Sequence, residues 1–138
     1  MELYRGRLID HIQLRCADFE ASKRFYGEVL AVLGMELVEL TPQMVYADEL
    51  VLTPAGSDPV SRIHLAFQVP SREIVDRFHA VALGAGGRDN GRPGERPYHP
   101  GYYAAYVRDL EGNNIEAVHH GAGTRSADSI VIRPASPP

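Results

Sequence analysis

The sequence has almost no cysteine and shows no recognisable secretion signal or membrane-spanning segment. Cys16 is the only cysteine, so no disulfide can form within the chain, which fits a reducing compartment. The segment Met1–Arg5 lacks the apolar core of a signal peptide, and no apolar run approaches the length of a membrane span. We therefore expect a cytoplasmic protein.

Lysine is also scarce, and acidic residues outnumber basic ones. Lys23 is the only lysine, and the formal net charge is −4. Because binding to nucleic acid or to an anionic membrane surface needs a basic patch, neither is expected as a partner. The apolar fraction of 44% is ordinary, and 138 residues are enough for one compact domain.

The sequence repeats itself at a shift of 53 residues, which places His11 on His64 and Phe25 on Phe78. The apolar pattern follows the same shift, with Ile12 over Leu65 and Leu14 over Phe67. The repeat predicts an α+β fold built from two copies of one module, covering about residues 7–54 and 61–120. Residues 121–138 form a Gly-, Ala- and Pro-rich tail that we expect to be loose.

Each copy is predicted to open with an apolar strand, at about 8–16 and 62–69, followed by a helix. Asp18 and Ser71 are the expected N-caps, and Gly34 and Gly84 or Gly86 the expected ends of these helices. Further strands are predicted at 36–40, 44–47 and 49–53 in the first copy, and at 102–108 and 113–119 in the second. A weak strand is expected after Gly87, a long loop at 90–101, a hairpin turn at 109–112, and a short strand in the tail at 129–133.

The repeat gives two histidines equivalent places, so that both face a shared cleft if the modules pair about a pseudo-twofold axis. His11 and His64 are these residues, and Glu116 lies in the last strand of the second copy, where Val51 is its counterpart. A histidine in an apolar strand is more often a hydrogen-bonded core residue, and a lone strand glutamate is more often half-exposed. Their coincidence at related positions favours a divalent metal site with open positions for water or substrate.

Other polar residues near this strand have weaker assignments. Alternation puts Tyr102 and Tyr106 on one face of their strand; Tyr106 could supply a phenol to the cleft, while most of the aromatic strand is ordinary sheet packing. His119 and His120 are expected to be solvated, as are the loop arginines Arg92 and Arg96, for which contact with an anionic substrate is the alternative. His99 lies in the loop that is a candidate lid.

Four segments of the sequence are distinctive when taken together. They are Asp10-His11-Ile12, Arg24-Phe25-Tyr26, the run from His64 to Phe67, and the run from Tyr106 to Glu116 with its Asp-x-x-Gly-Asn-x-Ile-Glu pattern. With these segments the chain resembles one known family, the vicinal-oxygen-chelate superfamily, over about residues 7–120. The family contains glyoxalase I, the extradiol dioxygenases, fosfomycin-resistance transferases and bleomycin-binding proteins. The resemblance implies two βαβββ modules that form a curved mixed sheet around a central cleft, commonly in a homodimer.

The resemblance also implies a ligand set and a class of reaction. Carried over, the metal ligands are His11, His64 and Glu116, and the ion is a divalent metal such as Fe, Mn, Zn or Ni. The missing fourth ligand near Val51 counts against glyoxalase I, and Tyr106 matches the place of an active-site tyrosine in the extradiol dioxygenases. We expect a metal-dependent enzyme that acts on a small oxygen-bearing substrate, by dioxygenase-, lyase- or transferase-like chemistry. The alternative is a protein that binds a small molecule or antibiotic without catalysis.

Overall fold

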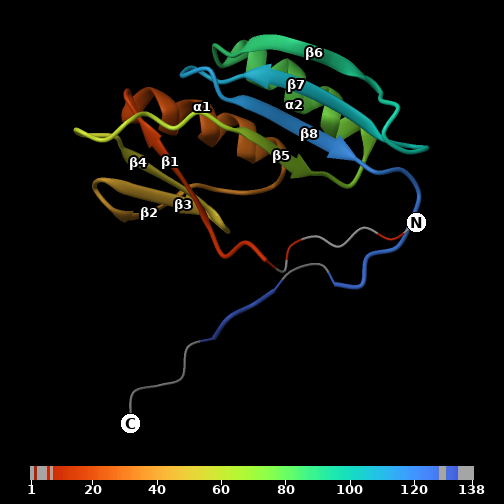
Figure 1. The fold of residues 1–138 in the computed structure, drawn as a ribbon, viewed down its shortest axis with the longest axis horizontal. Helices are drawn as coiled ribbons and strands as arrows, with labels where there is room; N and C mark the ends of the chain where they lie inside the picture. Colours follow the sequence, from red (N-terminus) through yellow and green to blue (C-terminus); the bar gives the residue numbers. More distant parts are fainter. Residues whose placement is uncertain (1, 3–5, 7, 128–129, 134–138) are drawn as a thin grey trace.

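The computed structural model describes residues 2, 6, 8–127 and 130–133, and it contains two four-stranded sheets and two helices (Figure 1). The elements of the first module are β1 (Ile12–Cys16), α1 (Phe19–Val32), β2 (Val38–Thr41), β3 (Met44–Ala47) and β4 (Leu50–Pro54). Those of the second are β5 (His64–Gln68), α2 (Arg72–Gly84), β6 (Arg88–Glu95), β7 (Tyr103–Arg108) and β8 (Asn114–His119). The predicted α+β fold with two modules is confirmed.

The two sheets have the same topology. Their strand orders are β1-β4-β3-β2 and β5-β8-β7-β6, and in each sheet the first and last strands of the module pair in parallel. Gln13 of β1 lies opposite Val51 of β4, and Ala66 of β5 lies opposite Glu116 of β8. Because Ala66 is the counterpart of Gln13 at the shift of 53 residues, Val51 occupies in the first sheet the place that Glu116 has in the second.

Both helices begin at the predicted caps. The carboxylate of Asp18 accepts the N–H of Ala21 at 3.0 Å, and the hydroxyl of Ser71 accepts the N–H of Ile74 at 3.3 Å. Each cap satisfies a backbone donor that has no partner within the helix. The helices end two residues before Gly34 and Gly86, which hold positive φ angles of 76° and 100° and turn the chain toward the next strand.

The helices cover one face of each sheet and leave the other face open. α1 packs against β4 and against α2, and α2 packs against β6, β7 and β8. Figure 1 shows α2 behind the second sheet in this view. The buried residues form one core that spans both modules and includes Leu14, Phe25, Val29, Leu30, Leu52, Val75, Phe78, Val107 and Ile115. Polar side chains on the opposite sheet faces are therefore free to form a site.

One buried carboxylate joins the modules. Asp109, in the turn between β7 and β8, accepts the Tyr26 hydroxyl of α1 at 2.6 Å and the Asn113 side-chain amide at 2.8 Å. Its other oxygen accepts the backbone N–H groups of Glu111 at 3.0 Å and Asn113 at 2.8 Å. The Asn113 side-chain oxygen in turn accepts the N–H of Ile63 at 2.8 Å, just before β5 begins. The turn, the start of β5 and the helix of the first module are thus held by a single network.

Two predictions about the second half of the chain are wrong. The segment 90–101 is not one long loop, because β6 continues to Glu95 and pairs with β7 despite its glycines and proline. Register shifts at Gly91 and Gly94 absorb the residues that do not fit a regular ladder. The predicted strand at 129–133 is absent in residues 130–133, and Ser129 lies outside the described residues.

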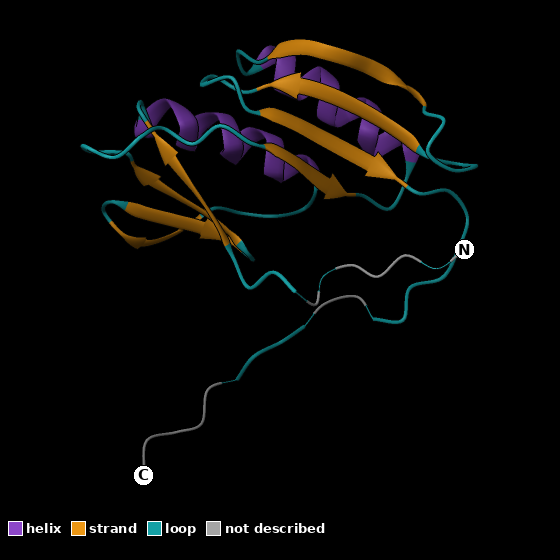
Figure 2. Ribbon diagram, in the orientation of Figure 1, coloured by secondary structure: helices purple, strands orange, loops and turns teal. Residues whose placement is uncertain are grey.

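Beyond β8, residues 121–127 and 130–133 contain no helix or strand (Figure 2). Within the described ranges, neither helix has the length and apolar character needed to cross a membrane.

Replacing Tyr26 by Phe is expected to lower the free energy of unfolding by about 1–3 kcal/mol, because it removes a donor from the buried Asp109. Chemical denaturation with urea measures this as a lower midpoint. Tyr46→Phe is the matched control, since Tyr46 lies half-buried on the open face of the first sheet. Equal midpoints for the two variants would show that the link through Tyr26 contributes nothing.

Cys16 is expected to resist alkylation in the folded protein. It is buried in β1, and burial together with the nearby Glu111 and Asp109 carboxylates raises the pKa of its thiol to about 11. Because only the thiolate reacts, iodoacetamide at pH 8 is expected to modify the folded chain at least about 100-fold more slowly than the chain in concentrated urea. Intact-mass measurement follows the reaction, and equal rates would contradict the buried placement.

Candidate functional site

His64 and Glu116 meet on the open face of the second sheet. His64 begins β5 and lies opposite Asn114, and Glu116 lies two residues further along β8. Side chains two residues apart on a strand share a face, so the register brings the imidazole and the carboxylate together. The distance from His64 Nε2 to Glu116 Oε2 is 3.0 Å.

Glu116 is buried in spite of its charge, with its side chain 3% exposed. A buried carboxylate is costly unless hydrogen bonds replace the lost water. The Tyr102 hydroxyl donates to Oε1, and His64 lies against Oε2. Each oxygen therefore has its own partner, and the orientation of the carboxylate is fixed.

Asn114 holds the other side of the His64 ring. His64 Nδ1 lies 3.0 Å from the Asn114 carbonyl oxygen and 2.9 Å from the Asn114 side-chain nitrogen, so an acceptor and a donor are both available to it. A proton on Nδ1 is donated to the carbonyl and leaves the Nε2 lone pair free. A proton on Nε2 is donated to Glu116, and Nδ1 then accepts from the amide. Asn90 fixes that amide by donating to its oxygen at 2.9 Å.

His64 and Glu116 could together supply two of the ligands of a divalent metal ion. Zinc and similar ions bind imidazole nitrogen and carboxylate oxygen at about 2.0–2.2 Å, so two donor atoms 3.0 Å apart can reach one ion. Metal-ligating histidines generally donate their second N–H to a carbonyl or carboxylate, and ligating carboxylates are themselves hydrogen-bonded. Asn114 and Tyr102 supply these outer contacts.

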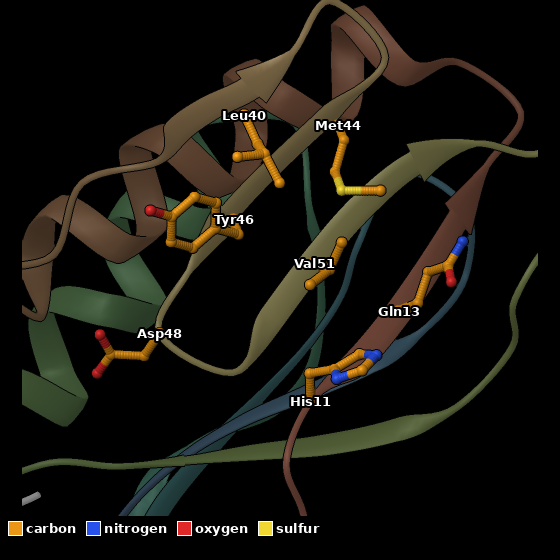
Figure 3. A pocket seen from close by; sticks show the side chains of 7 residues that line it. All are labelled: His11, Gln13, Leu40, Met44, Tyr46, Asp48 and Val51. Carbon is orange, nitrogen blue, oxygen red and sulfur yellow. The ribbon is translucent and has the colours of Figure 1, made fainter. Parts of the chain in front are cut away.

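His11 lies on the open face of the first sheet instead. Its Nδ1 is 2.6 Å from Asp10, and its side chain is 60% exposed. Figure 3 shows it at the edge of a pocket of about 290 Å³, where it is joined by Gln13, Leu40, Met44, Tyr46, Asp48 and Val51. Within the part of the chain that the structure describes, no group of three His, Cys, Asp or Glu side chains could hold one ion. One chain thus brings together two of the three predicted ligands.

Tyr106 forms a wall beside the His64–Glu116 pair. It lies opposite Glu116 across the strand pair, and its ring stacks near that of His64 with centroids 6.1 Å apart. Burial and the negative charge of Glu116 raise the pKa of the Tyr106 phenol to about 12. The hydroxyl therefore stays protonated at neutral pH and can donate a hydrogen bond to a ligand.

Tyr102 is the site residue that the sequence did not single out. Tyr102 does more than pack in the sheet, because its hydroxyl donates a hydrogen bond to Glu116. Burial and the Glu116 carboxylate raise the pKa of the Tyr102 phenol. The sequence feature that could have indicated this role is strand alternation, which puts Tyr102 on the same face as Tyr106. His99 and His120 pack edge-on against its ring, and their nitrogens lie 2.9 Å apart.

The prediction that the adjacent histidines after Glu116 are solvated is wrong. His120 is half-buried against His99, and His119 Nδ1 lies 3.2 Å from the Val69 carbonyl oxygen. Both histidines at the end of β8 therefore have specific contacts within the protein.

Comparison with known proteins agrees with this architecture. A family model described as Glyoxalase/Bleomycin resistance protein/Dioxygenase superfamily matches residues 8–117. A glyoxalase/bleomycin resistance protein from Albidiferax ferrireducens T118 is 30% identical, with a TM-score of 0.70, over 82% of this chain and 98% of that one. No functionally curated protein matches the chain.

Two more distant structures share the fold. A glyoxalase-related enzyme from Fulvimarina pelagi is 24% identical, with a TM-score of 0.67, over 88% of this chain and 99% of that one. Lactoylglutathione lyase from Agrobacterium tumefaciens is 22% identical, with a TM-score of 0.62, over 84% of this chain and 96% of that one. With the family model covering most of the chain, this protein belongs to the glyoxalase/bleomycin resistance protein/dioxygenase superfamily.

Proposed function

We propose that this protein is a metal-dependent enzyme of its superfamily that acts on a small oxygen-bearing substrate. The observation that carries the proposal is the His64–Glu116 pair, whose facing atoms lie 3.0 Å apart while outer partners hold both side chains. Such outer contacts are what a ligating histidine and carboxylate need. His11 is the third ligand of the proposed divalent ion.

We infer that His11 comes from a second copy of the chain. In one chain His11 lines a pocket on the first sheet, apart from the His64–Glu116 pair. A twofold dimer that sets the first sheet of each copy against the second sheet of the other would create two equivalent sites. The exposed His11 ring and the apolar pocket beside it support this arrangement, since both are accessible to a second copy.

The bound ion would supply Lewis acidity toward two neighbouring oxygens of the substrate. The chain itself supplies orientation and a hydrogen bond. Tyr102 and Asn114 fix the directions of Glu116 and His64, and the protonated Tyr106 phenol donates to a substrate oxygen. Tyr106 is the proposed catalytic residue of the site.

The reaction proposed is not that of a standard glyoxalase I, in which a fourth protein ligand completes the site. This part of the proposal is supported by the strand register, in which Val51 is the counterpart of Glu116. A valine side chain has no donor atom, so the ion would keep an open position for substrate or water.

His64→Ala is expected to weaken metal binding by more than about 100-fold, beyond the usual loss for an outer partner. The measurement titrates chelator-treated protein with Mn²⁺, Fe²⁺, Zn²⁺ and Ni²⁺ and counts bound ion per chain. His79→Ala is the control, because His79 pairs with Asp89 between α2 and β6 and is not one of the proposed ligands. Metal retained in the His64→Ala variant would overturn the site, and ligand binding without any metal requirement would favour a binding protein.

Mixing His11→Ala with Glu116→Gln subunits tests whether the site is shared. Each variant alone is expected to lose tight metal binding. A mixed dimer regains one intact site, with His11 from one copy and Glu116 from the other. Random assortment makes half of the dimers mixed, so tight metal binding should recover to about a quarter of the wild-type level. Recovery near zero after subunit exchange would overturn the proposed sharing of the site between two copies.

A further inference from the structure

The edge strand of the second sheet, β6, is irregular near Arg96, the residue that follows it. β6 is an edge strand that contains Gly91, Pro93 and Gly94, and its pairing with β7 shifts register between Asp89 and Gly91 and again between Gly91 and Gly94. Such bulges bend an edge strand and re-aim the side chains near it. Arg96, just beyond β6, lies over the ring of Tyr106 as a result.

Backbone carbonyls and neighbouring glycines hold the Arg96 guanidinium against Tyr106. Its carbon lies 5.3 Å from the centre of the Tyr106 ring, Nη2 donates to the Arg92 carbonyl at 2.7 Å, and Nη1 to the Glu95 carbonyl at 3.3 Å. A Cβ at Gly91 would lie 2.7 Å from Tyr106 Cδ2 and 3.3 Å from Nη2. A Cβ at Gly94 would lie 3.1 Å from Nη1. The glycines thus leave the space that the guanidinium occupies.

Among the residues that the structure describes, none neutralises the charge of Arg96. In the described ranges no carboxylate lies within ion-pairing distance of it, and the adjacent Glu95 is paired with Arg72 at 2.8 Å. A guanidinium has five N–H donors, and the two backbone carbonyls engage only part of this set. The remaining donors lie beside Tyr106, the residue that also contacts His64.

We propose that Arg96 binds a carboxylate of the substrate, so that the substrate is a small carboxylic acid anion. Its carboxylate would pair with the guanidinium while its neighbouring oxygens lie across Tyr106 toward His64 and Glu116. The planar fork of arginine matches a planar carboxylate, and a half-buried, stacked guanidinium loses little freedom on binding. The inference rests on the proposed function, because it names the substrate class of that same site.

The test titrates chelator-treated protein with benzoate and follows the arginine Nε–Hε signals by NMR. Wild-type protein is expected to bind benzoate, with the Arg96 signal shifting, and to bind the neutral benzamide at least about tenfold more weakly, as a charge-assisted pair requires. Arg96→Gln should lose benzoate binding by a similar factor, and Arg96→Lys should recover part of it. Phenylphosphonate in a parallel titration separates a preference for carboxylate from a general preference for anions.

Arg92→Gln is the matched control, because it removes an exposed positive charge four residues away and keeps the carbonyl that Arg96 uses. Its benzoate affinity should stay within about twofold of wild type, since an exposed charge acts weakly through solvent. Equal losses in the Arg92 and Arg96 variants, equal binding of benzamide, or tighter binding of phenylphosphonate would overturn the proposal. If Arg96→Gln does not fold, the comparison of benzoate with benzamide on wild-type protein still decides it.

Because the titration uses metal-free protein, its outcome is separate from that of the metal experiments. Benzoate binding that depends on Arg96, together with absent metal binding, would support the carboxylate subsite and remove the proposed metal centre. Metal binding without a role for Arg96 in benzoate binding would support the proposed metal centre and remove the carboxylate subsite.

Discussion

The arrangement of the site depends on the hydrogen bonds that the buried carboxylate of Asp109 accepts. This carboxylate ties the β7–β8 turn to α1 through Tyr26, and through Asn113 it reaches Ile63, the residue before His64. A fully satisfied polar network in a low-dielectric interior is rigid and specific. Because Glu116 is on the strand that leaves this turn and His64 is on the strand that Asn113 anchors, one network sets the register that brings them together.

The most distinctive sequence segment therefore has a structural role as well as a functional one. The Asp-x-x-Gly-Asn run from Asp109 to Asn113 forms the turn and contacts no proposed ligand directly. Glu116 follows this run in β8, at a position whose side chain points to the open face of the sheet, opposite Tyr106 of β7. Stability and site geometry are coupled here, because a change that loosens the turn also releases the strand that holds Glu116.

The two modules share a topology but have diverged in what their open faces carry. The second face has a carboxylate, an imidazole, two tyrosines and a seated arginine, whereas the first has His11 and an apolar pocket with Val51 where the carboxylate would be. This division suits a site in which one half supplies charge and orientation and the other supplies a ligand and a wall for the substrate.

The sequence by itself determined the two-module fold, the helix caps, the hairpin turn and the equivalence of Val51 and Glu116, because these follow from local pattern and an internal repeat. It could not determine that β6 runs to Glu95, since glycine and proline normally interrupt strands and only pairing with β7 overrides that preference. Tyr102 on Glu116 and Arg96 over Tyr106 were likewise decided by tertiary structure. These contacts join residues whose approach depends on bulges and on the packing of neighbouring strands, which no periodicity in one sequence encodes.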